Sequence, residues 1–116
     1  GMYLPGETYA AAAGFVLGYD EACEGGLLAG FREWLVVRAG AGANLAWFAL
    51  VLDSAFPSAR DPQQAVLESA DTQRHAIEVL FRLIVEFDDV CARRDGLASV
   101  FRAYDCWLRD HGIDTP

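Results

Sequence analysis

The stretch from residue 71 to residue 94 carries the clearest pattern of apolar and polar positions in the chain. Its polar side chains recur at steps of three and four, so they line one edge of a helix with 3.6 residues per turn. They are His75, Glu78, Arg82, Glu86, Asp89 and Arg93. Most of the remaining circumference is apolar, which is typical of the central helix of a helical domain. We therefore predict that residues 71–94 form a helix on which the other elements pack.

Three apolar segments before this helix also have helical spacing, and glycine or proline separates them. The expected helices are residues 7–23, 27–38 and 45–56. Asn44 is a good N-cap for the third helix, and Pro57 is expected to end it. Gly14 and Gly18 share a face of the first helix, where their small size would permit close approach of another helix.

Two further helices are expected, on either side of the central one. Asp61-Pro62 has the form of an N-cap followed by proline, which predicts a short helix that ends near Ala70. Apolar positions continue in register from there, so residues 62–94 form either one helix or two, with Asp71 as the second N-cap. The last helix, residues 97–111, is expected to bury Leu97, Phe101, Tyr104 and Leu108. The pattern as a whole predicts an all-α bundle of about five helices around a central helix near residues 71–94.

A chain of 116 residues is expected to form a single domain, residues 1–116, with Gly1 left from cloning. Hydrophobic residues make up 53% of it, which is more than a core of this size easily hides. We therefore expect a dimer or another protein to cover an apolar face, the alternative being a monomer with an unusually efficient core. The uncharged run Leu45–Leu52 is the strongest candidate for such a face. Its candidate interface residues are Leu45, Trp47, Phe48 and Val51.

Charge and cysteine content narrow the choice of partner and compartment. The net charge of −8 argues against nucleic acid and against anionic membranes as partners. Cys23, Cys91 and Cys106 are odd in number and are expected to be buried free thiols in a reducing compartment. All nine basic residues are arginine, which together with the many alanines and glycines is typical of a GC-rich bacterial genome. We expect a cytoplasmic bacterial protein.

Imidazole and carboxylate side chains on the central helix offer the best case for chemistry. His75, Glu78 and Glu86 lie on one edge and would suit a metal if a facing helix supplied further ligands. No second motif of this kind exists in the sequence, and a solvated row of ion pairs is the preferred explanation of this edge. The sequence also lacks the nucleophile-elbow, phosphate-loop and zinc-protease motifs. We therefore expect no enzyme, no catalytic residue, no metal and no cofactor.

The end of the first helix carries the candidate partner-binding residues. Asp20, Glu21 and Glu24 place negative charge near a helix C-terminus, where it opposes the helix dipole. The acids are therefore not placed for helix stability, and they would suit a basic protein surface. We predict that these three acids and Arg32 contact a protein partner, the alternative being an ordinary solvated helix end.

Three short motifs lie between residues 18 and 52. They are Gly18-Tyr19-Asp20, Gly30-Phe31-x-x-Trp34-Leu35, and Asn44 followed by Trp47. With them, this part of the chain resembles the front half of small, acidic, all-helical bacterial immunity proteins, which neutralise a toxin delivered between cells. The resemblance implies a non-enzymatic cytoplasmic protein that covers the active surface of a basic toxin. The alternatives are a structural or regulatory homodimer and, less favoured, a small metal-binding or enzymatic helical protein.

Overall fold

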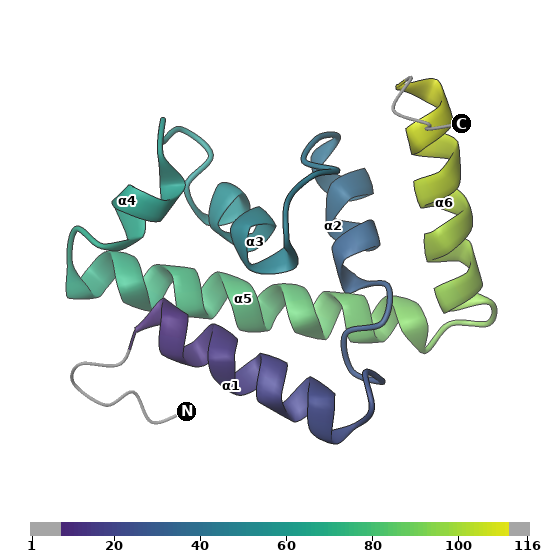
Figure 1. Cartoon of the computed structure of the whole chain (residues 1–116), viewed down its shortest axis with the longest axis horizontal. Coiled ribbons are helices and arrows are strands. Elements are labelled where there is room, and N and C mark those ends of the chain that lie inside the picture. Colours follow the sequence, from purple (N-terminus) through teal and green to yellow (C-terminus); the bar gives the residue numbers. More distant parts are fainter. Residues whose placement is uncertain (1–7, 112–116) are drawn as a thin grey trace.

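The computed structural model describes residues 8–111, in which six helices and no strand are present (Figure 1). The helices are α1 (Tyr9–Ala22), α2 (Phe31–Ala39), α3 (Trp47–Ala55), α4 (Pro62–Val66), α5 (Ala70–Cys91) and α6 (Gly96–Asp110). The predicted all-α fold is therefore confirmed. Among the described residues, no helix combines the length and the apolar character needed to cross a bilayer. Glu7, expected to open the first helix, and Gly1 lie outside the described residues.

α5 is the helix around which the domain is built. It contacts all five of the other helices, with α1 along one side and α2 and α3 on the other (Figure 1). Its buried side chains are Ala76, Ile77, Val79, Leu80, Leu83 and Phe87. Along the edge predicted to face water, His75, Glu78, Arg82 and Asp89 are all exposed. The prediction of a central helix in this segment is confirmed.

Phe31, the first residue of α2, is the centre of an aromatic cluster that joins three helices. Its ring centroid lies 5.3 Å from that of Phe87 on α5 and 6.0 Å from that of Trp47 on α3. The Trp34 ring stacks on the Phe31 ring, with 6.1 Å between the two ring centroids. Phe31 is fully buried, and each ring pair of this kind contributes roughly 0.5–1.5 kcal/mol beyond the burial of its area.

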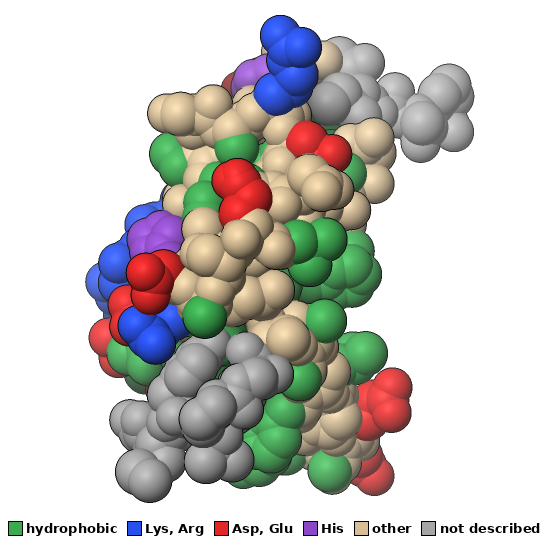
Figure 2. Space-filling model, turned by 90° about the vertical axis from the view of Figure 1, so that its left-hand side faces the viewer, with side chains coloured by type: hydrophobic (Ala, Val, Ile, Leu, Met, Phe, Trp, Pro, Cys, Tyr) green, Lys and Arg blue, Asp and Glu red, His purple; other side chains and the backbone are tan. Residues whose placement is uncertain are grey.

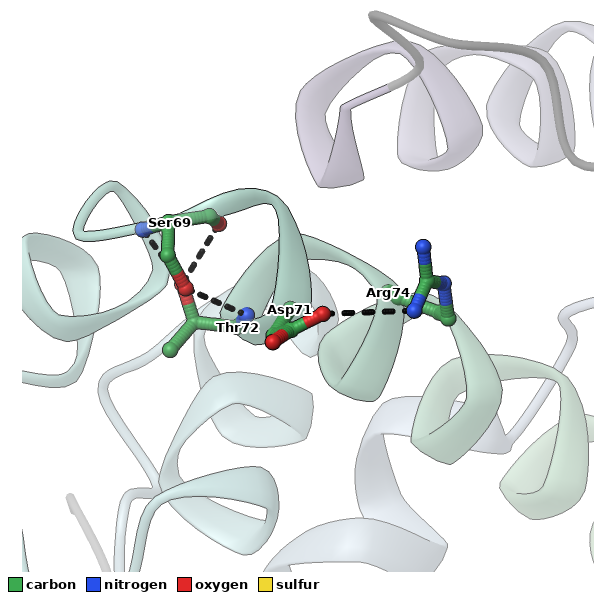
Figure 3. A network of polar contacts seen from close by, with 4 residues as sticks. All are labelled: Ser69, Asp71, Thr72 and Arg74. Carbon is green, nitrogen blue, oxygen red and sulfur yellow. Dashed lines mark hydrogen bonds and ion pairs between the residues drawn. The ribbon is translucent and has the colours of Figure 1, made fainter.

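The segment between α4 and α5 shows that residues 62–94 form two helices. Ser69 Oγ accepts a hydrogen bond from the Thr72 N–H at 3.1 Å, and the Ser69 N–H donates to Thr72 Oγ1 at 3.0 Å (Figure 3). This reciprocal capping box begins α5 at Ala70. Asp71 lies in the first turn of α5 and pairs with Arg74 at 3.2 Å. Asp71, the alternative considered for the second N-cap, does not cap α5, because the capping side chain is that of Ser69, two residues earlier.

Residues 27–30 form a turn, so α2 begins four residues later than predicted. Asp20 Oδ1 accepts a hydrogen bond from the Leu28 N–H at 2.8 Å, which draws this backbone away from a helix. Gly30 then has a φ of +86°, a left-handed conformation that interrupts helical geometry. A side chain from α1 thus overrides the helical spacing of the segment.

α3 begins at Trp47, two residues later than predicted. The N-cap position belongs to Ala46, which makes no side-chain capping bond. A turn precedes it, closed by the Leu45 N–H donating to the Gly42 carbonyl at 2.9 Å. Asn44 lies within this turn with its side chain exposed, so the predicted N-cap is wrong.

α6 lies across one end of α5 and packs on α2 and α5 (Figure 1). Val100 is its buried large side chain, whereas Leu97 is 38% exposed and Phe101 is 41% exposed. Tyr104 and Leu108 are half-buried. The predicted burial of Leu97 and Phe101 is wrong because α6 meets the rest of the domain along one face only.

In the loop between α2 and α3, Gly42 packs so closely on the core that it leaves no room for a side chain. At Gly42 the φ is +89°, and a Cβ would lie 2.5 Å from Cδ2 of the buried Leu50. We expect Gly42→Ala to lower the free energy of unfolding by about 2–4 kcal/mol, measured by urea denaturation, because backbone strain and overpacking combine.

Gly40→Ala is the matched control in the same loop. Gly40 has a φ of +72°, but no atom lies within 4 Å of its Cβ position. The control should therefore cost only the strain of a left-handed residue, about 1–2 kcal/mol. Equal losses in the two variants would contradict the packing of Gly42 against Leu50.

Candidate functional site

Nine large hydrophobic side chains among the described residues are exposed to water. Single exposed hydrophobic residues are common, whereas a contiguous group of them often marks a binding surface. Leu17 of α1, Phe48 of α3 and Leu67, which follows α4, form such a group because they line the same groove. In the described part of the chain, this groove is the strongest candidate for a functional site.

The groove lies between α1 on one side and α3 and α4 on the other, and it has a volume of about 510 Å³. The α1 wall is Ala10, Ala13, Gly14 and Leu17, and the opposite wall is Trp47, Phe48, Leu52, Val66 and Leu67. None of its thirteen lining residues is charged. Seen from the α4 end, hydrophobic side chains gather on the right of the molecule, with acidic side chains at the lower right, and a mixed cluster of charged and histidine side chains lies along the left margin (Figure 2). We call the groove lined by these thirteen residues the α1–α3 groove.

Tyr9 connects the two walls of the α1–α3 groove. Its hydroxyl donates to the Phe48 carbonyl at 2.6 Å, and its backbone N–H donates to Gln73 Oε1 at 2.7 Å. The side chain is 5% exposed, and this burial raises the pKa of the Tyr9 hydroxyl. These bonds tie α1 to α3 and α5, so they fix the spacing of the two walls of the groove.

The α1 wall is built from small residues that face open space. A Cβ at Gly14 or at Gly18 would meet no atom within 4 Å, so no helix of residues 8–111 packs on either glycine. The predicted helix contact at these glycines is wrong because α1 packs on the domain through Tyr9 and Val16, which lie on the opposite face. The small side chains of the α1 wall instead leave open space between α1 and the opposite wall of the groove.

The three acids predicted to bind a partner lie together at the end of α1, but their contacts differ. Asp20 uses one carboxylate oxygen to hold the Leu28 N–H, so it stabilises the turn that follows. Glu21 and Glu24 are exposed, and neither forms an ion pair with another described residue. Of the three, Glu21 and Glu24 are therefore the carboxylates free to meet a partner.

Arg32, the fourth predicted partner-binding residue, is engaged inside the molecule. Its Nε donates to the Leu45 carbonyl at 2.9 Å, and Nη2 donates to the Ala43 carbonyl. Nη1 lies 3.3 Å from the Tyr104 hydroxyl oxygen and 3.2 Å from Glu33 Oε2. The hydrogen bond with Tyr104 is the largest contribution that raises the pKa of Arg32. The guanidinium thus joins α2, the loop before α3, and α6.

The predicted interface on the third helix is largely used for packing. Val51 is fully buried, and Leu45 and Trp47 are half-buried against the core. Phe48, by contrast, is 45% exposed and lines the α1–α3 groove together with Trp47. Val51 therefore has no surface to offer a partner, because its side chain faces the centre of the domain.

The side chains considered for metal or catalytic chemistry are dispersed and have contacts of their own. His75 Nε2 lies 2.9 Å from the Ala55 carbonyl oxygen, and its ring meets Phe56 edge-on at 5.5 Å. Glu86 pairs with Arg38 of α2 at 2.9 Å. Among the described residues, no three or more His, Cys, Asp or Glu side chains are grouped to hold a metal ion.

The three cysteines are free thiols, as predicted, but they are not all buried. Cys23 and Cys106 are exposed, so their predicted burial is wrong. Cys91 is half-buried on α5, and burial together with the negative charge of Asp88 raises the pKa of its thiol. Cys23 follows the last residue of α1, where the chain leaves the helix, and Cys106 lies on the exposed face of α6.

A second hollow lies where the loop between α2 and α3 faces α6. It has a volume of about 660 Å³ and is lined by residues 40–44, Tyr104, Trp107, Leu108 and His111. Trp107 Nε1 is buried without a hydrogen-bond partner, and its ring stacks on His111 at 4.3 Å. Sequence reasoning missed this hollow because its two sides are far apart in the chain.

No protein-family model matches this chain, and no curated protein or solved structure matches it either. The likeness of residues 18–52 to immunity proteins therefore rests on the sequence motifs alone. Function has to be inferred from the geometry of the site, since a helical fold by itself supports many activities.

Replacing Arg32 tests whether its role is structural. We expect Arg32→Lys to lower the free energy of unfolding by about 1–3 kcal/mol, because one ammonium group cannot reach both carbonyls and the Tyr104 hydroxyl. Arg38→Lys is the matched control, since Arg38 is half-exposed and its ion pair should contribute less than about 1 kcal/mol. Urea denaturation measures both. If Arg32→Lys were no more damaging than the control, the structural role would be refuted.

The raised pKa of Tyr9 predicts a loss of stability at alkaline pH. Burial favours the neutral phenol, so the folded protein keeps this proton at pH values where the unfolded chain loses it. The contribution of Tyr9 is therefore complete below its ordinary pKa of 10.0 and declines as the pH rises above that value. We expect Tyr9→Phe to remove this decline and to cost about 1–2 kcal/mol near neutral pH, because the Phe48 carbonyl loses its donor.

Urea unfolding at about pH 7, 9 and 10.5 measures the effect of Tyr9→Phe. Tyr19→Phe is the control, because Tyr19 lies on the same helix and is exposed. The control should retain both the stability and the pH dependence of the parent. An unchanged alkaline decline in Tyr9→Phe would show that other groups cause it.

Proposed function

We propose that this chain is a non-enzymatic protein-binding module that uses the α1–α3 groove. Its most concrete form is an immunity-type protein that neutralises a basic toxin domain. The observation that carries the proposal is an uncharged, apolar groove, spanned by the Tyr9 hydrogen bonds, on a chain with a net charge of −8. An apolar centre within a polar and charged rim is the usual composition of a protein–protein interface.

Two side chains of the groove are suited to anchor a partner. Leu67 is 66% exposed and Phe48 is 45% exposed, so each would lose contact with water in a complex. Complete burial of a large apolar side chain contributes roughly 1.5–3 kcal/mol. Trp47, which lines the same groove, is of the residue type most enriched at the energetic centres of interfaces.

Charge supports a basic partner. Glu21 and Glu24 are exposed and free of ion pairs within the described residues, and the whole chain carries a net charge of −8. Such a surface accelerates the approach of a positively charged protein and repels nucleic acid. The three free thiols agree with a reducing cytoplasm, and the immunity-type motifs of residues 18–52 support a bacterial source.

A structural or regulatory homodimer is the second candidate. Phe81 and Val85 favour it, because they lie one turn apart on α5 and are exposed outside the groove. Two copies would each bring a net charge of −8, so their association is opposed at low salt. A molar mass that rises with concentration in light scattering would support this second function.

We expect the double variant Glu21→Lys and Glu24→Lys to bind its partner more slowly than the parent. The partner for this test is the protein encoded immediately upstream of the gene, which the proposal expects to be a toxin. Reversing both charges should lower the association rate about tenfold at low salt, and the difference should shrink at high salt. Asp20 is left unchanged because its carboxylate holds the turn after α1.

The matched control for this charge reversal is Asp105→Lys with Asp110→Lys on α6, where both residues are exposed. Each acid-to-lysine substitution raises the net charge by two, so either double variant takes it from −8 to −4. Surface plasmon resonance measures the rates. Equal slowing in the two variants would mean that net charge alone is responsible, and no binding by the parent would end the toxin-neutralising form of the proposal.

A further inference from the structure

The α1 wall of the groove follows helical spacing that continues beyond the groove. Ala10, Gly14, Leu17 and Glu21 are separated by four, three and four residues, so they share one face of α1. The first three line the groove, and Glu21 lies one turn beyond Leu17, exposed. At 1.5 Å per residue the apolar part of this wall is about 10 Å long. An apolar track two turns long thus ends at a carboxylate.

The opposite wall ends in the same way. Leu67 follows α4 and is 66% exposed, and the next residue, Glu68, is exposed as well. The groove itself contains no charged residue, since its polar side chains are those of Thr8, Tyr9, Gln63 and Gln73. The groove therefore has two apolar walls with a carboxylate beyond each of them.

The shape of the site favours a helix as the occupant. An extended peptide usually adds to a sheet by pairing with an exposed strand edge, and residues 8–111 contain no strand. An amphipathic helix instead lays an apolar stripe into a groove between two helices. The groove between α1 and the α3–α4 pair matches this second mode.

The charges decide what kind of helix fits. Glu21 and Glu68 would face the polar flanks of a bound helix, and the chain as a whole carries −8. A second copy of this chain brings the same negative charge, which makes it a poor occupant. A helix with lysine or arginine beside its apolar stripe gains from both carboxylates.

We propose that the α1–α3 groove binds one amphipathic helix of the partner protein. The apolar stripe of that helix lies against Leu17, Phe48 and Leu67, and its basic flanks face Glu21 and Glu68. This inference rests on the proposed protein-binding function and names the feature of the partner that the groove recognises.

The probe is a fluorescent 18-residue peptide of leucine and lysine whose leucines recur at i, i+3, i+4 and i+7. Two controls keep its length: one replaces every lysine by glutamate, and one places two prolines in the centre. Fluorescence anisotropy should show a dissociation constant in the micromolar range for the probe, and values at least tenfold weaker for both controls. Binding of the glutamate or the proline peptide as tightly as the probe would overturn the proposal.

Two glycines on α1 provide a matched pair of protein variants. Gly14 lines the groove and Gly18 does not, and a Cβ at either position would meet no atom within 4 Å. Both Gly14→Leu and Gly18→Leu should therefore fold, because leucine also has the higher helix propensity. Gly14→Leu should fill the groove and weaken binding of the probe at least tenfold, whereas Gly18→Leu should stay within twofold of the parent. Equal affinities for the two variants would place the probe elsewhere.

A second pair tests the opposite wall in the same assay. Leu67→Arg puts a positive charge where the probe is basic, and Val85→Arg makes the same change at an exposed position outside the groove. The first should weaken binding at least tenfold, and the second should leave it within about twofold to threefold. Equal weakening in both would show that the probe responds to net charge and not to the groove.

The upstream-encoded protein separates failure of this inference from failure of the proposed function. If that protein binds the parent and Gly14→Leu equally well, the protein-binding function stands and the groove inference is wrong. If it binds neither, the toxin-neutralising form fails, while the peptide assay still reports on the groove. Light scattering of the parent and of Gly14→Leu tests whether a second copy of the chain occupies the groove. If the parent is a dimer and Gly14→Leu is a monomer, a second copy fills the groove.

Discussion

Covering the apolar circumference of α5 is the constraint on which the rest of the structure depends. α5 has 22 residues, so it is about 33 Å long, and one short helix cannot cover it. α2 and α3 cover one side and α1 the other, and the buried contact of Phe31 with Phe87 fixes α2 on this rod. The α1–α3 groove is a consequence of this arrangement. Tyr9 joins α1 to α3 at one end, and the small residues that follow it leave space between the walls.

The architecture could be predicted from the sequence because burial on α5 is strong and follows a clear period. The starts of α2 and α3 could not, because side chains distant in the chain hold the backbone there. Asp20 takes the Leu28 N–H, and Arg32 holds the carbonyls of Ala43 and Leu45. Local helix propensity contains no information about such bonds. The exposure of Leu97 and Phe101 was also beyond sequence reasoning, since it depends on how much of α6 the domain covers.

The candidate site was less predictable than the fold, and α1 shows why. Its residues are small or apolar around most of the circumference, so the pattern does not reveal which face packs on α5. Gly14 was therefore compatible both with a buried helix contact and with an open groove, and only the position of α3 and α4 decides between them. The acids at the end of α1 were visible in the sequence. That Asp20 has a structural bond while Glu21 is free depends on the turn at Leu28.

The same geometry would couple the proposed binding of a partner in the groove to the stability of α1. This helix is fixed by Tyr9 and Val16 on its inner face, while Leu17 and Gly14 on the groove side remain in water. A partner in the groove would cover that side and press α1 onto α5, and any ligand that binds only the folded state raises its stability by mass action. Such a partner would account for part of the high hydrophobic content of 53%. Of the nine exposed large hydrophobic side chains among the described residues, Leu17, Phe48 and Leu67 lie where a second protein would cover the groove side of α1.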